Sequence, residues 1–321
     1  MRIAVTGSIA TDHLMTFPGR FAEQFLAGKL DKISLSFLVD GLEIRRGGVA
    51  ANIGFGLGCL GLRPVLVGSV GSDFAEYRSW LEEHGVDTAL VRESGRHHTA
   101  RFVCTTDADM SQIASFYPGA MSEDADIDLA MLEGRADLVL IGAGNPDAMQ
   151  SLTRQCRELA IPFAADTSQQ LAVLEGAQIR DLVGGAAYLF CNEYEASLTE
   201  HKTGWSAGEL ISRVGARVTT LGSAGARVDR EGEPPVLVGP VKDVTPHEPT
   251  GAGDAFRAGF LAAVAWGLGL ERAAQLGNLM AVHALETTGT QEYKLLPAIL
   301  AARCADSYGR EAADEIAAHI N

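Results

Sequence analysis

The stretch Glu248-Pro-Thr-Gly-Ala-Gly-Asp-Ala-Phe256 joins a turn to the beginning of a long apolar run. Pro249 fixes its own φ and favours extended backbone in the residue before it, so the chain is expected to enter the turn extended. Gly251 and Gly253 lack side chains and allow the backbone to approach another group closely. The run from Ala255 to Trp266 contains few helix-breaking residues and predicts a buried helix.

A helix that begins at such a turn presents free N–H groups and the positive end of its dipole, which together favour a bound phosphate. Asp254 lies in the first turn of this helix, where the dipole favours the ionised form that can accept a proton. An anion site at Gly251, Ala252 and Gly253 beside a carboxylate base predicts phosphoryl transfer to a hydroxyl group. The alternative is a tight turn in which Asp254 is only a first-turn charge.

Composition limits the classes of protein that this chain can be. Its 321 residues are 47% hydrophobic and 21% charged, as in an ordinary globular protein. A net charge of −15 argues against a nucleic-acid partner, because phosphate backbones require an excess of Lys and Arg. The five cysteines are scattered, which indicates buried thiols in a reducing compartment. The apolar runs are too short for a secretory signal or a membrane span, so we expect a cytoplasmic protein without a membrane partner.

Strand-like and helix-like segments alternate over most of the chain. The strand-like segments are Arg2–Thr6, Pro64–Val70, Val86–Val91, Leu138–Ile141, Phe163–Ala165, Tyr188–Cys191 and Arg217–Leu221. This alternation indicates an α/β fold, a three-layer sandwich with a central, mostly parallel sheet between helices. Ligands of such sheets bind at the carboxyl ends of the strands.

Two segments interrupt the alternation, at about 14–46 and about 97–118. The first contains the strand-like run Ile33–Val39, and the second resembles a hairpin that ends at Tyr117. We interpret the two segments as one small β-sheet that forms a lid within a single domain of residues 1–321. The edges of this sheet could pair with a second copy, so we expect a homodimer through the lid.

The glycines of Gly56-x-Gly58-x-x-Gly61 match the dinucleotide-binding fingerprint, but they lie within a helical stretch rather than after a strand. We interpret them as sites of close helix packing. The sequence also contains no Walker A loop and no Gly-x-Ser-x-Gly elbow.

A second candidate site is Gly47-Gly48-Val-Ala-Ala-Asn52, where two glycines precede a predicted helix. The glycines allow a ligand to approach the backbone, and Asn52 can both donate and accept. Asp12 adds a carboxylate in a predicted loop, Ser8–His13, after the first strand. An ordinary turn and helix cap would use the same residue types.

Taken together, these motifs resemble the ribokinase-like (PfkB) sugar and nucleoside kinases. The run Thr250–Phe256 resembles the C-terminal signature of that family, and Asp12 with Gly-Gly-x-x-x-Asn52 resembles its N-terminal signature. The resemblance extends from Gly7 to the final helices and implies the ribokinase-like fold. It implies that Asp254 is the general base and that Asp12, Gly48 and Asn52 hold a sugar. It also implies ATP and Mg²⁺, and it leaves open a monovalent cation such as K⁺.

Further elements resemble the nucleotide side of the family. Asn192-Glu-Tyr-Glu195 is similar to its Asn-x-x-Glu element, in which Glu195 would organise Mg²⁺ through water and Asn192 would face the phosphates. The alternative is a solvated first-turn glutamate. The resemblance of the run from Thr219 to Gly225 to the nucleotide loop implies ATP contacts at Thr220, Gly222 and Gly225, and Asn278 aligns with a position beside adenine.

Within the family, the chain most resembles the bacterial (actinobacterial-type) adenosine kinases. The resemblance rests on Val5–His13, Leu35–Val39, Ala100–Phe102, Gln112–Met121 and Ala164–Gln170. It implies that Phe102 and Phe116 sandwich a purine, that Ser8 and Ser36 bond its edge, and that Gln169 and Gln170 lie at the substrate. Stacking of this kind is worth roughly 1–3 kcal/mol per base. Alternatively, both rings only pack the lid on the core.

The sequence therefore predicts ATP-dependent phosphorylation of the 5′-hydroxyl of adenosine to AMP, a purine-salvage reaction. The first alternative is the same chemistry on a free sugar, ribose or fructose, and the second is a non-catalytic nucleoside sensor. Glu248 and Pro249 depart from the Asp and Thr that are usual in the family, but neither changes the predicted anion site or base.

Overall fold

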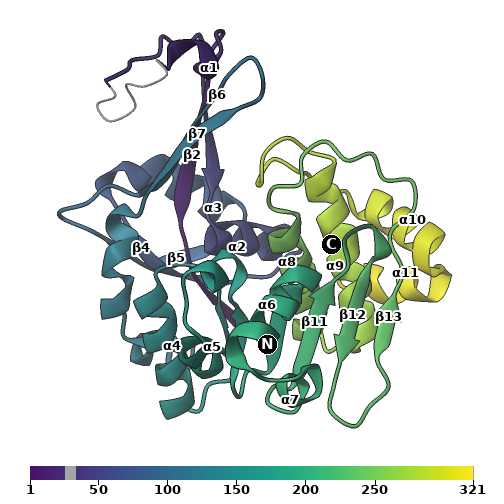
Figure 1. Ribbon diagram of the computed structural model, residues 1–321. Coiled ribbons are helices and arrows are strands. Elements are labelled where there is room, and N and C mark those ends of the chain that lie inside the picture. Colours follow the sequence, from purple (N-terminus) through teal and green to yellow (C-terminus); the bar gives the residue numbers. More distant parts are fainter. Residues whose placement is uncertain (26–33, 321) are drawn as a thin grey trace.

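A computed structural model describes residues 1–25 and 34–320 (Figure 1). Its main sheet has nine strands in the order β13-β12-β11-β10-β9-β8-β1-β4-β5. The strands are β1 (Ile3–Thr6), β4 (Val65–Val70), β5 (Asp87–Glu93), β8 (Leu138–Ile141), β9 (Phe163–Asp166), β10 (Tyr188–Asn192), β11 (Ala216–Thr220), β12 (Ala226–Asp229) and β13 (Val236–Val238). All pairs from β11 to β5 are parallel, and β12 and β13 continue the sheet antiparallel. The predicted mostly parallel sheet is confirmed.

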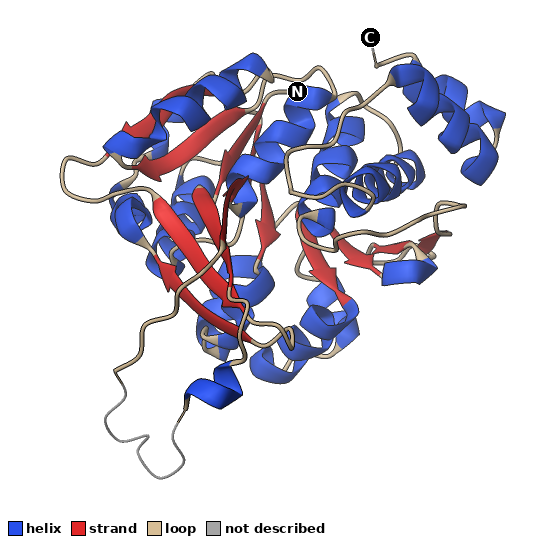
Figure 2. Cartoon of the chain, turned by 90° about the horizontal axis from the view of Figure 1, so that it is seen from above, coloured by secondary structure: helices blue, strands red, loops and turns tan. Residues whose placement is uncertain are grey.

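Helices cover both faces of the main sheet, as Figures 1 and 2 show. One face carries α2 (Val49–Cys59), α3 (Ala75–Glu83), α8 (Ala252–Ala265), α9 (Leu270–Leu285), α10 (Pro297–Tyr308) and α11 (Arg310–Ala317). The other carries α4 (Pro146–Glu158), α5 (Gly176–Val183), α6 (Glu193–Thr203) and α7 (Ala207–Ile211). Because strands such as β1, β4 and β8 are buried along their whole length, they are continuous apolar runs in the sequence.

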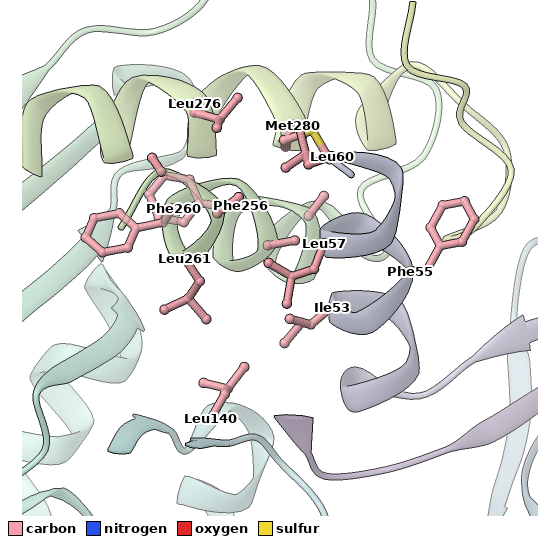
Figure 3. Close-up of a cluster of buried hydrophobic side chains, with 14 of the residues drawn as sticks. Ile53, Phe55, Leu57, Leu60, Leu140, Phe256, Phe260, Leu261, Leu276 and Met280 are labelled. Carbon is pink, nitrogen blue, oxygen red and sulfur yellow. The ribbon is translucent and has the colours of Figure 1, made fainter. Parts of the chain in front are cut away.

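The core on the first face is formed where α2, α8 and α9 meet (Figure 3). Ile53 and Leu57 of α2 approach Phe256 and Phe260 of α8, with Leu140 of β8 beneath them. These side chains are at most 1% exposed, and each contributes about 1.5–3 kcal/mol by its burial. This packing fixes the first turns of α2 and α8 beside each other.

Two glycines of α2 permit close approach, Gly56 to α8 and Gly58 to the end of α3. A Cβ at Gly56 would lie 2.7 Å from the Cβ of Ala258, and one at Gly58 would lie 1.9 Å from the carbonyl oxygen of His84. The interpretation of the Gly-x-Gly-x-x-Gly match as close packing is therefore confirmed for Gly56 and Gly58, whereas Gly61, with φ of 81°, lies after α2 and has open space around it.

A second sheet of four strands has the order β3-β2-β6-β7 and extends away from the main sheet in Figure 1. Its strands are β2 (Ala10–Thr16), β3 (Gly41–Gly47), β6 (Ala100–Thr106) and β7 (Gln112–Tyr117), and the short α1 (Phe21–Gln24) follows β2. Strand β2 pairs in parallel with β6, which joins the two segments that interrupt the alternation. Of the first segment, residues 26–33 lie outside the described part.

Two local predictions in this region were wrong. The predicted loop Ser8–His13 is largely strand β2, and residues 34–39 of the predicted strand Ile33–Val39 are not in a strand. Strand β2 pairs in parallel with β6, which is distant in the sequence. A pairing between distant segments leaves no local pattern that would predict a strand at β2.

Two further observations concern the cysteines and membrane insertion. All five cysteines are free, and four of them are buried. In the described part of the chain, every helix is too short or too polar to cross a bilayer.

Candidate active site

A cleft of about 680 Å³ lies between the carboxyl ends of the main-sheet strands and the inner face of the second sheet. Its lining comes from five separate parts of the chain: Ser8–Leu14, Arg45–Asn52, Phe102–Phe116, Ser168–Thr220 and Glu248–Thr290. Most of the predicted site residues line it, namely Ser8, Asp12, Gly48, Asn52, Phe102, Phe116, Gln169, Asn192, Glu195, Thr220, Gly251, Gly253 and Asp254.

Helix α8 begins at this cleft. Gly251 precedes its first residue with φ of 81°, and a Cβ there would lie 2.8 Å from Thr290 Cγ2, so both conformation and space require glycine. Among the described residues, no side chain caps this end of the helix. The N–H of Ala252 donates to Pro249 O at 3.3 Å, and no hydrogen bond to a described residue engages the N–H groups of Gly253 and Asp254, which are therefore available to an anion.

Asp254 lies in the first turn of α8, and its Oδ2 accepts a hydrogen bond from Asn52 Nδ2 at 2.9 Å. Burial raises the pKa of Asp254 to about 6, although the Arg257 guanidinium and the Asn52 hydrogen bond act to lower it. The expectation that the helix dipole would dominate was incomplete, because loss of water around the carboxylate has the larger effect. A pKa near 6 suits a general base that works at neutral pH.

The orientation of Asn52 is fixed by residues that the sequence did not indicate. Its Oδ1 accepts a hydrogen bond from Gln291 Nε2 at 2.9 Å and lies 2.9 Å from Thr290 Oγ1, whose one hydroxyl proton is shared with Arg46 O at 3.0 Å. With its oxygen held in this way, the amide presents Nδ2 to Asp254. Thr290 and Gln291 lie after α9, outside the two signatures, and no pattern in the sequence marks them.

The second sheet brings Asp12 to the cleft. Asp12 on β2 is paired with Arg45 on β3, and a Cβ at Gly47 would lie 2.9 Å from Asp12 Oδ2. Burial raises the pKa of Asp12 to about 6, while Arg45 acts to lower it and Glu248 to raise it. The glycine at 47 therefore leaves room for a half-buried carboxylate with a raised pKa.

Gly48 and Ser8 shape the backbone beside Asp12. Gly48 has φ of 96°, and a Cβ there would lie 2.5 Å from the carbonyl oxygen of Ser8. Ser8 Oγ accepts a hydrogen bond from Val49 N at 2.9 Å, so this hydroxyl also orders the beginning of α2.

Phe102 on β6 and Phe116 on β7 are directly paired and lie on the cleft face of the second sheet, in the same row as Asp12. Phe116 is 49% exposed, which is unusual for so large an apolar ring. Ser36 is exposed and does not line the cleft. Gln170 turns away from it, since its Nε2 donates to Gly144 O at 2.8 Å.

On the opposite side of the cleft, Asn192 and Glu195 form a capping box at the beginning of α6. Asn192 Oδ1 accepts from Glu195 N, and Glu195 Oε2 accepts from Asn192 N, both at 2.8 Å. Burial raises the pKa of Glu195, so it is not a fully solvated first-turn charge.

Other predicted nucleotide residues lie outside the cleft lining. Gly222 and Gly225 have φ of 57° and 96°, and a Cβ at Gly225 would lie 2.1 Å from Val238 O. Asn278 is buried, and its Nδ2 donates to Gly239 O and to Tyr308 Oη, each at 3.1 Å. The cleft thus unites most of the predicted acceptor and phosphate residues, but not Ser36 and Gln170 or these three.

A divalent cation would find hard oxygen atoms on this side. Glu195 faces the cleft and offers carboxylate oxygens there. Within the same residues there is no group of three His, Cys, Asp or Glu side chains that could hold a metal alone. The residues therefore fit a Mg²⁺ ion that takes its other ligands from phosphate and water.

A layered α/β fold with an acid at an open helix N-terminus defines a class of phosphotransferases. The family model for pfkB family carbohydrate kinases matches residues 8–297, and the chain belongs to that family. It is accordingly a ribokinase-type kinase of nucleosides or sugars.

Three relatives illustrate this range. The Burkholderia thailandensis nucleoside kinase in complex with inosine superposes with a TM-score of 0.82 at 31% identity, covering 96% of this chain and 97% of that one. The nucleoside kinase of Methanothermobacter thermautotrophicus is 31% identical over 253 residues, 76% of this chain and 80% of that protein. The ribokinase of Bacillus subtilis is 27% identical over 306 residues, 90% of this chain and 94% of that protein.

Proposed function

We propose that the protein phosphorylates the 5′-hydroxyl of adenosine with ATP to give AMP, a purine-salvage reaction. The observation that carries the proposal is the Asp254–Asn52 contact at the open end of α8, in a cleft whose other wall holds Phe102 and Phe116. Relatives that act on nucleosides support the choice of acceptor class.

In the proposed reaction, Asp254 accepts the proton of the 5′-hydroxyl. The 5′-oxygen forms a bond to the γ-phosphorus while the bond from that phosphorus to the ADP oxygen breaks. The N–H groups of Gly251, Ala252 and Gly253 bind the charge that spreads over the transferred group, that of Ala252 in place of its 3.3 Å hydrogen bond to Pro249 O. The proton remains on Asp254 until product release.

The acceptor is held by both sheets. Asp12 accepts hydrogen bonds from the ribose hydroxyls, and Asn52 and the backbone of Gly48 fix the ring. Phe102 and Phe116 stack on the purine, and Ser8 and Gln169 lie within the same cleft. Ser36 and Gln170 reach the purine only after movement of their segments, because neither lines the cleft here. Closure of the lid would exclude water and limit ATP hydrolysis.

On the donor side, Asn192 and Thr220 face the phosphates of ATP. Gly222, Gly225 and Asn278 border the nucleoside part of ATP outside the described cleft. Mg²⁺ held near Glu195 would neutralise the phosphate charges. A monovalent cation such as K⁺ is left as an option.

A sugar kinase that accepts ribose or fructose is the second candidate, favoured by the likeness to ribokinase over most of the chain. An ADP-release assay with adenosine, inosine, guanosine, ribose and fructose separates the candidates. The proposal predicts the highest kcat/KM for adenosine. Higher kcat/KM for a free sugar would replace it with the second candidate, and no ADP release with any acceptor would favour a nucleoside sensor.

We also propose a homodimer through the second sheet. Its outer face carries exposed apolar side chains in paired rows: Leu42, Ile44, Ile113 and Tyr117 are each more than 40% exposed. A second copy would cover this surface. Sedimentation of the wild type and of Ile44→Lys checks the proposal, which predicts that the variant is monomeric.

A further inference from the structure

Arg257 lies on α8 three residues after Asp254, and its side chain lines the cleft although the residue is only 7% exposed. Its Nη2 donates to Asp166 Oδ1 at 2.6 Å and to Ser168 Oγ at 3.2 Å, both just after or at the end of β9. The guanidinium is thus fixed over the carboxyl ends of the main-sheet strands, on the helix that carries the proposed base.

The other side of this guanidinium has no such partner. Nη1 makes no hydrogen bond to any described residue, and Nε is buried without a partner. Nη1 is directed toward Gly253, where a Cβ would lie only 2.7 Å from it. A charged donor therefore faces the cleft beside the free N–H groups of α8.

The carboxylates around Arg257 weaken its attraction for a bound anion, but they also hold its guanidinium in place. Burial acts to lower the pKa of Arg257, and Asp166, Asp254 and Glu195 more than offset it, so the pKa is raised. A purely structural ion pair with Asp166 accounts for Nη2. It does not account for Nη1, a charged donor that faces the cleft without a partner among the described residues.

We propose that Arg257 is a catalytic residue of the phosphoryl transfer. Its Nη1 donates to an equatorial oxygen of the phosphoryl group as that group passes from ADP to the acceptor oxygen. Arg257 gives up no proton, and it stabilises charge that is greatest in the transition state. This proposal rests on the proposed kinase reaction at the same site.

The first test compares Arg257→Lys and Arg257→Met with the wild type. Loss of one preorganised donor is expected to lower kcat by about 10²- to 10³-fold, with little change in KM for adenosine. A folded variant with kcat within a few fold of the wild type would overturn the proposal. If the wild type itself turns over no nucleoside or sugar, the kinase proposal fails instead, and the two failures are distinguishable.

Since Arg257→Met leaves Asp166 buried without its partner, the double variant Arg257→Met/Asp166→Leu serves as the stability control. Replacing both partners of a buried ion pair by apolar groups is often neutral for stability. The double variant is expected to regain thermal stability and to keep the low kcat. Recovery of kcat together with stability would show that Arg257 acts only through the fold.

A binding experiment gives a readout that does not depend on turnover. ADP with aluminium fluoride and adenosine imitates the transferred phosphoryl group, whereas ADP alone does not. The Arg257→Lys variant is expected to lose about 10²-fold in affinity for the fluoride complex and to bind ADP alone as the wild type does. Equal losses for both ligands would overturn the proposal.

Discussion

At the scale of single residues, Asp254 and Asn52 depend on each other. Asp254 is a half-buried acid with a raised pKa, and Asn52 is the one neutral donor that contacts its carboxylate in the described chain. Thr290 and Gln291 prevent the amide of Asn52 from turning, because Gln291 Nε2 donates to its oxygen and Thr290 Oγ1 lies 2.9 Å from that oxygen. The proposed base is therefore oriented by a chain of contacts rather than by its helix alone.

Asp254→Asn is expected to lower kcat by about 10²- to 10⁴-fold, because the amide cannot accept the hydroxyl proton. ATP and adenosine binding should change little. Burial raises the pKa of Asp254 from 3.8 in an unfolded chain to about 6 in the fold. The free energy of unfolding therefore falls as the pH rises between these two values. At neutral pH the ionised Asp254 destabilises the fold. The variant should therefore also melt at a higher temperature.

Asp243→Asn makes the same chemical change at an exposed residue outside the cleft and serves as the control. Kinetics and melting curves of the two variants check the prediction. Near-normal turnover by Asp254→Asn would remove Asp254 from the reaction.

At the scale of elements, an ion pair connects the second sheet to the turn before α8. Arg45 Nη1 on β3 donates to Glu248 Oε2 at 2.9 Å, and the same oxygen accepts from Gly289 N at 3.1 Å. Both residues act on Asp12 with opposite sign: Arg45 lowers its pKa and Glu248 raises it. Glu248, which replaces the Asp that is usual in the family, is therefore the residue that contacts Arg45 across the cleft.

If Asp12 binds ribose as a carboxylate, kcat/KM for adenosine should rise with pH through about 6, where the proposed base Asp254 also loses its proton. Arg45→Met should move this midpoint upward, because it removes the cation that lowers the pKa of Asp12. Glu248→Gln should move it downward. Glu43→Gln, at an exposed partner of Arg45, is the control. If both variants moved the pH midpoint in the same direction, the ion pair would position the second sheet rather than set the pKa of Asp12.

The packing of α2 gives a second prediction at this scale. Gly58→Ala should destabilise the protein by about 1–3 kcal/mol, because the new methyl group overlaps the carbonyl oxygen of His84. Gly208→Ala in α7 meets nothing within 4 Å and should stabilise by about 0.5–1 kcal/mol through helix propensity. Denaturant unfolding of the two variants should therefore give free-energy changes of opposite sign.

At the scale of the whole molecule, the cleft exists only because two sheets meet. The main sheet and α8 supply the phosphate side, and the second sheet supplies Asp12 and the two aromatic rings. The proposed acceptor, a nucleoside, would carry its sugar hydroxyl to the first side and its flat ring to the second.

Phe116→Ala should raise KM for adenosine by roughly 5- to 150-fold, the range that corresponds to about 1–3 kcal/mol of stacking, and should leave KM for ribose nearly unchanged. Tyr117→Ala, the adjacent position on the outer face of β7, is the matched control. Equal effects on the nucleoside and the sugar would favour the sugar-kinase alternative.

The sequence alone determined the alternation that gives the parallel sheet, the turn at Gly251–Gly253, Asp254 in the first helical turn, and the Gly-Gly-Asn element. Each of these depends on residues that are close in the chain, where periodicity and turn chemistry are local.

The tertiary structure alone decided the pairing of β2 with β6 and the contacts of Asn52, Arg45 and Arg257. Asn52 lies 202 residues from Asp254 and 239 from Gln291, and Arg257 lies 91 residues from Asp166. Such contacts are chosen by how whole elements pack, so no local pattern contains them. The raised pKa of Asp254 has the same origin, because burial is a property of the assembled fold.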